Sequence, residues 1–277
     1  MVKPKIACYI TGGWTECRAM TQFLEKINSN YDYRQRFPQK GVGKKGKTKR
    51  NFKITGATGT DLLNEVYHDM RNHTEEIKGF QAILIEDDMD DQYFLKGECV
   101  RDYARIENRK QEITNEIRKI LSMPDMPVFF LYAMPEIESW FVADWDHTFG
   151  IEYYGKLINM NTYFSITFRN YVLKQVLTDK YPLEEIENYG YFDGVYKKLS
   201  DQLINAFHEY SCQDVSDKNN KLFNEKINGL IKNNKLMYSK KGEGINMLLN
   251  LNPDKVAEIC GHYFAKTYHE LREFHME

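Results

Sequence analysis

The chain has 277 residues, of which 42% are hydrophobic and 14% aromatic, and its formal net charge is −2. This composition excludes an intrinsically disordered chain, and the length allows one large core or two modest domains. No apolar run approaches the roughly 20 residues that a membrane-spanning helix needs. The five cysteines are widely spaced and form no C-x-x-C pair. We therefore expect a cytoplasmic protein with reduced thiols, no signal peptide and no membrane partner.

The first half of the chain alternates segments with strand-like and helix-like patterns. Lys5–Ile10 is a short apolar run that ends at a Thr-Gly-Gly turn, and Thr15 is placed to cap a helix reaching about Asn28. Tyr31–Phe37 alternates aromatic and polar residues, as a strand does. Further strands are predicted at 52–55, 80–85 and 127–133, and further helices at 58–73 and 98–121. This alternation predicts an α/β fold with a mainly parallel sheet flanked by helices.

From about Ile151 the pattern changes, and strand-like runs become scarce. Helical patterns follow one another at 164–177, 192–210, 219–233 and 253–275. The last of these is entered by Asn252 as a capping residue and Pro253 in the first turn. We therefore predict an α/β domain over residues 1–150 and a helical C-terminal region over residues 151–277 that packs on it.

An acidic run follows the predicted strand Ala82–Ile85: Glu86–Asp91 contains five carboxylates in six residues. Two carboxylates about 4 Å apart repel by roughly 1 kcal/mol in water and about 4 kcal/mol in a partly desolvated site. Such a cluster needs a cation, shared protons or splayed side chains, and oxygen ligands favour Mg²⁺ or Mn²⁺ over zinc. A solvated acidic turn is the alternative. In a parallel sheet this run should meet Thr11–Glu16 and Met134–Glu138 at the carboxyl edge.

A basic segment balances the acidic one. From Tyr33 to Thr60 there are nine Lys or Arg and no Asp or Glu, which suits a phosphate-rich ligand. Within it, Gly41–Thr48 matches the nucleotide-binding pattern G-x-x-x-x-G-K-[ST]. The flanking residues, 36–39 and 49–52, form neither a convincing buried strand nor an apolar helix. The sequence therefore favours a basic loop that follows a nucleic-acid backbone over a nucleotide site, and a plain solvated loop stays open.

Two other segments carry residues suited to the same chemistry. Glu138 lies two residues before Trp140 at the predicted carboxyl edge, where it can add a carboxylate to a metal site. A surface helix with one buried tryptophan is the alternative. Tyr238–Lys241 combines an aromatic residue with lysines before a predicted helix, and can either hold a phosphate or form an ordinary loop. The seven histidines show no metal-ligand spacing, and no Ser-His-Asp arrangement is legible.

Four segments together resemble a known group of proteins. They are Ile10–Glu16, Asp88–Asp90, Pro135–Trp140 and Tyr238–Lys241. The set is similar to the small TOPRIM-like proteins related to the OLD (overcoming lysogenization defect) nucleases and to RloB. The resemblance implies a TOPRIM-like sheet and Mg²⁺-dependent phosphodiester chemistry. It also implies a prokaryotic protein, encoded in many cases beside an ATPase and associated with defence against phage.

The chain departs from that family at one position. A glutamate usually stands just before the first glycine of the turn, whereas this chain has Thr11. Glu16 matches the family's second glutamate, and Asp88 and Asp90 match its D-x-D motif. The missing acid puts catalysis in question more than metal binding, and Glu86 or Glu138 is the candidate to replace it.

We therefore expect a nuclease that uses Mg²⁺ or Mn²⁺ to hydrolyse DNA or RNA. The alternative is a catalytically degenerate TOPRIM-like protein that binds nucleic acid, acts as a sensor or partners an ATPase encoded nearby. The oligomeric state stays open. The candidate catalytic residues are Glu16, Asp88, Asp90, Glu138 and Lys240, the candidate metal ligands Glu16, Asp88, Asp90 and Asp91, and the candidate nucleic-acid contacts Lys44, Lys45, Lys47, Lys49 and Arg50.

Overall fold

A computed structural model describes most of the chain. The described residues are 3–38, 57–95, 100–152, 162–212, 238–239 and 241–275. The predicted strand at 52–55 and the predicted helix at 219–233 lie outside them. None of the described helices is long and apolar enough to cross a lipid bilayer.

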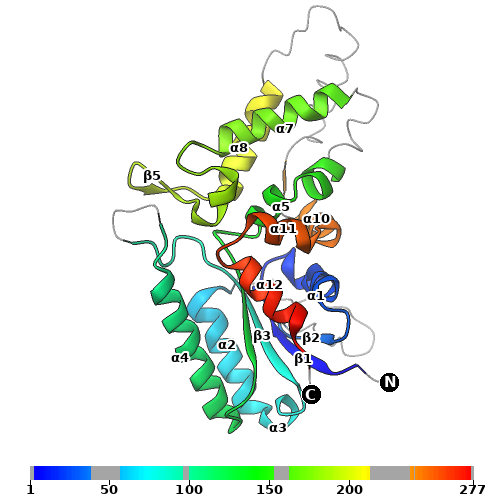
Figure 1. Cartoon of the computed structure of the whole chain (residues 1–277), viewed down its shortest axis with the longest axis vertical. Coiled ribbons are helices and arrows are strands. Elements are labelled where there is room, and N and C mark those ends of the chain that lie inside the picture. Colours follow the sequence, from blue (N-terminus) through cyan, green and yellow to red (C-terminus); the bar gives the residue numbers. More distant parts are fainter. Residues whose placement is uncertain are drawn as a thin grey trace, which may run out of the picture.

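A four-stranded parallel sheet forms the centre of the α/β part (Figure 1). Its strands are β1 (Lys5–Tyr9), β2 (Asp32–Phe37), β3 (Ala82–Asp88) and β4 (Val128–Ala133), in the order β2-β1-β3-β4. The inner strands β1 and β3 are covered on both faces, which is why they read as continuous apolar runs rather than alternating ones. The predicted parallel sheet flanked by helices is confirmed.

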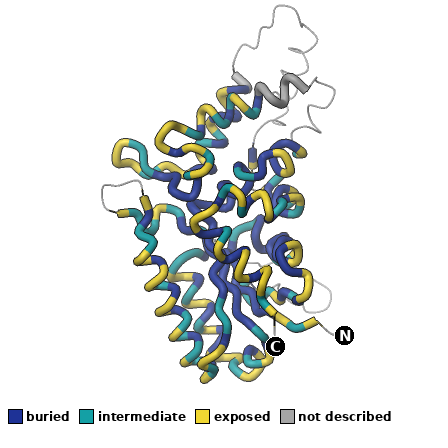
Figure 2. Tube along the Cα trace, in the orientation of Figure 1, coloured by how far each residue is buried: buried dark blue, intermediate teal, exposed yellow. Residues whose placement is uncertain are grey.

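One face of the sheet is covered by α1 (Glu16–Ile27) together with C-terminal helices, of which α12 (Phe264–Glu273) lies on β4. Helix α1 buries Met20, Phe23, Leu24 and Ile27, which share one side at helical spacing. The Thr267 hydroxyl of α12 donates to a β4 carbonyl at 2.7 Å. The first helix and the last ones therefore share one hydrophobic core with the sheet, visible as the dark centre of Figure 2.

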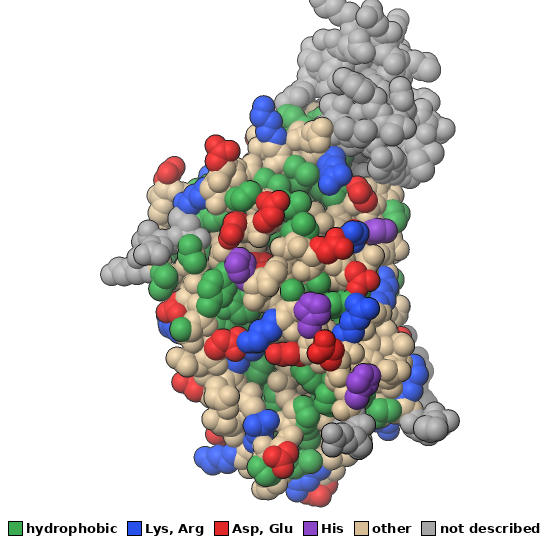
Figure 3. Space-filling view, in the orientation of Figure 1, with side chains coloured by type: hydrophobic (Ala, Val, Ile, Leu, Met, Phe, Trp, Pro, Cys, Tyr) green, Lys and Arg blue, Asp and Glu red, His purple; other side chains and the backbone are tan. Residues whose placement is uncertain are grey.

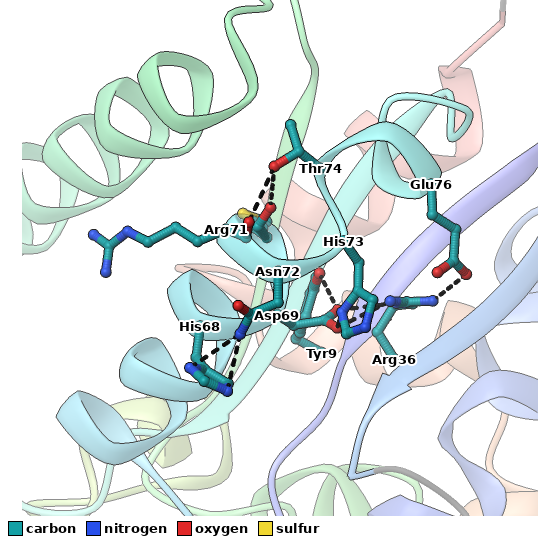
Figure 4. Close-up of polar contacts among 10 residues, drawn as sticks. Tyr9, Arg36, His68, Asp69, Arg71, Asn72, His73, Thr74 and Glu76 are labelled. Atoms are coloured by element: carbon teal, nitrogen blue, oxygen red, sulfur yellow. Dashed lines mark hydrogen bonds and ion pairs between the residues drawn. The ribbon is translucent and has the colours of Figure 1, made fainter.

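The other face carries α2 (Gly59–Asn72), α3 (Thr74–Ile77) and α4 (Tyr103–Leu121). A polar network fixes the edge strand β2 to this layer (Figure 4). The Asp69 carboxylate accepts two hydrogen bonds from Arg36 at 2.9 Å and one from the Tyr9 hydroxyl at 2.9 Å, and it lies 2.7 Å from His73 Nδ1. Arg36 also pairs with Glu76. Arg36, one of the nine cations of the basic segment, therefore serves the fold.

The start of α4 differs from the prediction. The sequence pattern placed it at Glu98, but the helix begins at Tyr103 because the Asp102 side chain accepts the backbone N–H of Arg105 at 3.0 Å and caps it there.

The C-terminal part is helical, as predicted, and extends beyond the carboxyl edge of the sheet (Figure 1). Its main helices are α7 (Thr162–Val176), α8 (Leu199–Cys212), α10 (Gly244–Asn250), α11 (Pro253–Ile259) and α12. It also has the short turn η2 (Leu183–Asn188), and two short helices, α5 (Glu138–Ala143) and η1 (Asp146–Gly150), directly precede it. The described residues do not test the predicted domain boundary at residue 150.

Two of the predicted C-terminal helices are longer than the helices in the structure. Residues 191–196 form a hairpin, β5 (Tyr191–Phe192) and β6 (Val195–Tyr196), whose turn residues Asp193 and Gly194 both have positive φ. The predicted helix at 253–275 is divided into α11 and α12. The Glu187 carboxylate accepts the backbone N–H groups of residues 262, 263 and 264, so a new helix begins there.

Candidate functional site

The three predicted turns meet at the carboxyl edge of the sheet. The Thr11 amide after β1 donates to Glu86 Oε2 at 2.9 Å. After β4, the Ile137 amide donates to Asp88 Oδ1 at 3.2 Å, and the Asp90 amide donates to the Pro135 carbonyl at 2.7 Å. The acidic end of β3 therefore lies between the turns that follow its two neighbouring strands.

The acidic run is partly strand, not wholly turn. Strand β3 continues through Asp88, because Glu86, Asp87 and Asp88 pair with Leu131, Tyr132 and Ala133 of β4. Alternate residues of a strand point to opposite faces, so Glu86 and Asp88 point to the face of α1 and α5, and Asp87 to the face of α2. The Asp87 carboxylate accordingly accepts the amide of Gly59, the first residue of α2, at 2.8 Å. The sheet itself splays the clustered charges.

Glu86 is the most constrained carboxylate of the site. It is fully buried, and its Oε2 also accepts the Thr11 hydroxyl at 2.5 Å. Burial raises the pKa of the Glu86 carboxyl well above its ordinary value, and the charge of Glu16 raises it further. Its other oxygen, Oε1, is buried and has no hydrogen-bond partner among the described residues. Glu86 and Glu16 therefore form a buried acidic pair.

Glu16, at the start of α1, lies over the glycine turn. Its carboxylate sits so close to Gly13 that a Cβ at that position would be 2.1 Å from Glu16 Oε2. A side chain at position 13 would therefore displace the Glu16 carboxylate from its present place. Helix α10 closes on the same turn, because a Cβ at Gly244 would be 2.3 Å from Thr15 Oγ1.

Glu138 is joined to a segment 100 residues further along the chain. It is fully buried at the start of α5, and the Tyr238 hydroxyl donates to its Oε1 at 2.7 Å. The Tyr238 ring packs against Phe149 and Phe207. Two of the segments singled out in the sequence, 135–140 and 238–241, therefore meet in space, although Lys240 lies outside the described residues.

Asp90 and Asp91 are placed differently from Asp88. Asp90 has a left-handed backbone with φ of 42°, and its carboxylate accepts a hydrogen bond from Lys198 Nζ at 2.9 Å. Asp91 is exposed. Asp88, with its bond to the amide before Glu138, is the aspartate that the strand directs toward the face of Glu86 and Glu16. Lys198 was not a candidate from the sequence, since a lysine beside a predicted helix carries no distinctive signal.

The candidate nucleic-acid contacts, Lys44, Lys45, Lys47, Lys49 and Arg50, lie outside the described residues. Phe37 and Ala57, which stand on either side of these residues in the sequence, are described, and the carbonyl of each accepts a hydrogen bond at the glycine turn. The Ile10 amide donates to the Phe37 carbonyl at 3.0 Å, and the Gly12 amide donates to the Ala57 carbonyl at 3.4 Å. Phe37 and Ala57 therefore both lie beside the glycine turn.

The donor set can be tested against a divalent cation. Among the described residues, no three His, Cys, Asp or Glu side chains are grouped to hold a metal ion. Two carboxylates such as Glu16 and Glu86 are a kind of donor set that Mg²⁺ uses in many proteins, together with waters and substrate phosphates. The buried Oε1 of Glu86 without a hydrogen bond is the oxygen best placed for such a ligand.

A scan against protein-family models and searches of curated proteins and of solved structures found no match to this chain. The fold is therefore described by its architecture. A four-stranded parallel sheet flanked by helices is compatible with a Rossmann-like or TOPRIM-like fold.

Proposed function

We propose that this protein is a cytoplasmic nuclease that hydrolyses phosphodiester bonds of DNA or RNA with Mg²⁺ or Mn²⁺. The observation that carries the proposal is the buried pair of Glu16 and Glu86 at the carboxyl edge of a parallel sheet, with Asp88 on the same face. The further proposal of a role in prokaryotic defence against phage rests on the resemblance of the sequence motifs alone.

In this proposal Glu86 replaces the glutamate that the family has at the position of Thr11. The amide and hydroxyl of Thr11 hold one oxygen of Glu86 and leave the other for the cation. Glu16 is the other proposed ligand, and Asp88, which accepts the Ile137 amide on the same face of the sheet, is proposed to position the ligands. A bound ion would lower the pKa of a water molecule and stabilise the charge that develops on the phosphate.

The remaining residues position the substrate. The Tyr238 hydroxyl holds Glu138, and Lys240, two residues further along the chain, is proposed to contact a phosphate. The lysines of the basic segment are proposed to bind the nucleic-acid backbone with little sequence preference. Asp90, paired with Lys198, and the exposed Asp91 are given no direct role.

The first test is cleavage of labelled DNA and RNA by the full chain with Mg²⁺, with Mn²⁺ and with EDTA. We expect cleavage only with a divalent ion, and a loss of at least about tenfold in Asp88→Asn. Asp125→Asn is the matched control, because Asp125 is an exposed aspartate in the turn before β4, at the opposite edge of the sheet. Equal activity of Asp88→Asn and Asp125→Asn would remove Asp88 from the site.

A second candidate function is favoured by the ion pair of Asp90 with Lys198. A chain whose second motif aspartate is neutralised by its own lysine fits a degenerate protein that binds nucleic acid, or that serves as a sensor or as the partner of an ATPase. Titration calorimetry separates the two, since a degenerate site should show no saturable binding of Mg²⁺ or Mn²⁺. Absence of cleavage together with retained binding of nucleic acid would favour this alternative.

Gly13→Ala is a conservative way to disturb the proposed site. The added methyl group would overlap Glu16 Oε2 and force that buried carboxylate away from the glycine turn. We expect roughly a 10- to 100-fold loss of cleavage, with destabilisation of only about 1–3 kcal/mol in urea unfolding. Gly261→Ala is the control, because a Cβ there meets nothing within 4 Å. Full activity in Gly13→Ala would show that the position of Glu16 does not matter.

A further inference from the structure

Trp14 and Arg18 form a stacked pair at the rim of the carboxylate site. Arg18 lies in the first turn of α1, four residues after Trp14, and its guanidinium carbon is 3.7 Å from the centre of the indole ring. Arg18 is exposed, and Trp14 is half-buried. The planar cation therefore lies flat on an aromatic ring with its outer side open to solvent.

The pair lies beside the two buried glutamates. Trp14 directly follows Gly13, over which the Glu16 carboxylate is placed. Arg18 follows Glu16 by two residues in the first turn of α1. Trp14 and Arg18 therefore lie on either side of Glu16 along the chain, which places the cation within one helical turn of the acidic pair.

Arg18 does not act as the counter-ion of those glutamates. Its guanidinium makes no hydrogen bond or ion pair with another residue of the described ranges, in contrast to Arg36, which forms two hydrogen bonds to Asp69. Stacking occupies only the face of the guanidinium and leaves the N–H groups at its rim for an incoming anion. The Trp14 indole N–H likewise has no acceptor among the described residues, so no polar contact explains this ring.

A nucleic-acid strand would need such a cation here. The phosphodiester that approaches Glu16 and Glu86 is repelled by them, and a positive group at the rim offsets that repulsion. Guanidinium planes and indole rings also stack on unpaired bases, which a duplex does not offer. On the face drawn in Figure 3, acidic and basic side chains are interspersed.

We propose that Arg18, held flat by Trp14, binds a backbone phosphate next to the scissile bond, and that an unpaired base stacks on this pair. The preferred substrate is accordingly a single strand. This inference rests on the proposed function, because it concerns the substrate of the same site.

The test is binding of a short oligothymidylate to the full chain in EDTA, followed by tryptophan fluorescence over a range of salt concentrations. Trp14 is the informative reporter, since Trp140 and Trp145 are 0% and 4% exposed. We expect quenching in the parent and none in Trp14→Phe. Arg18→Gln should bind about tenfold more weakly, with a salt dependence smaller by about one phosphate contact. Arg18→Lys should keep the salt dependence and lose affinity for the base.

Arg71→Gln is the matched control, because Arg71 is also an exposed helical arginine over an aromatic ring, 5.9 Å from the centre of Tyr67, but lies at the end of α2.

Unchanged affinity in Arg18→Gln, or quenching that persists in Trp14→Phe, would overturn the inference. Equal affinity for a duplex would overturn the single-strand preference, and inorganic phosphate that quenches as strongly as the oligonucleotide would overturn the base contact. Because no metal is present, these results do not depend on whether the protein cleaves. A parent that cleaves while Arg18→Gln binds normally defeats only this inference.

Discussion

Glu86→Gln is expected to abolish metal-dependent cleavage while making the protein more stable. Glutamine is similar in shape and keeps an oxygen for the amide and hydroxyl of Thr11. It removes the charge that would bind a cation, and loss of several kcal/mol of transition-state stabilisation lowers the rate roughly a thousandfold. It also removes a buried charge beside Glu16, which should raise the free energy of unfolding by about 1–3 kcal/mol at pH 8.

This variant is informative because the expected changes in cleavage and in stability have opposite signs. If the Glu86 carboxylate served only the fold, its neutralisation would lower the stability of the protein or leave it unchanged. Cleavage would not be affected. The stability gain of Glu86→Gln should shrink toward pH 4. Folding raises the pKa of Glu86, so at low pH the Glu86 carboxyl of the parent is protonated and, like glutamine, uncharged. Urea unfolding in EDTA and cleavage with Mg²⁺ measure the two effects. Asp125→Asn reports on the loss of an exposed carboxylate elsewhere. Lower stability together with normal cleavage in Glu86→Gln would contradict the proposed site.

Asp87→Asn is expected to remove a large part of the pH dependence of stability. Asp87 is buried on the α2 face, its Oδ2 accepts the Gly59 amide, and its Oδ1 has no hydrogen-bond partner among the described residues. Burial raises the pKa of this carboxyl from 3.8 to about 7, and the charge of Asp90 adds to the shift. The folded state therefore holds a proton that the unfolded state releases.

The direction of the effect follows from that difference. The contribution of Asp87 to stability is fully present below pH 3.8 and is lost as the pH rises to about 7. A shift of about three pKa units corresponds to about 4 kcal/mol. Asparagine can still accept from Gly59 and has no charge to bury, so the variant should match the parent near pH 4 and exceed it by about 2–4 kcal/mol at pH 8.

Urea unfolding from pH 4 to pH 8 in EDTA measures this prediction. Glu86 and Glu187 also have raised pKa values through burial, so the Asp87→Asn variant keeps a residual slope of the same sign, and the difference between parent and variant isolates Asp87. A parent and an Asp87→Asn variant that lose stability in parallel would show that Asp87 is ionised at neutral pH in the folded protein.

Much of the fold follows from local patterns in the sequence. The apolar runs at Lys5–Ile10 and Pro127–Ala133 predict β1 and β4 within a residue, and the helical spacing of Met20, Phe23 and Ile27 predicts α1. The hairpin at 191–196 was missed because a two-residue Asp-Gly turn lay inside a pattern that also fits a helix. The break between α11 and α12 was missed because it depends on Glu187, far away in the chain.

The candidate site, like the fold, follows in part from the sequence and in part only from the tertiary structure. The sequence determines which residue types are available to the site. It also predicts that the turns after three strands meet at one edge, because parallel strands with helical crossovers bring their carboxyl ends together. That Glu86 and Asp88 face Glu16 while Asp87 faces α2 was decided by the register with β4, which extends β3 into the acidic run. The hydrogen bond of Tyr238 to Glu138 and the pairing of Asp90 with Lys198 were likewise decided by tertiary packing. The physical reason is that periodicity reports only a residue's immediate neighbours along an element. The partner and charge state of a buried carboxylate depend instead on groups that distant segments bring to it.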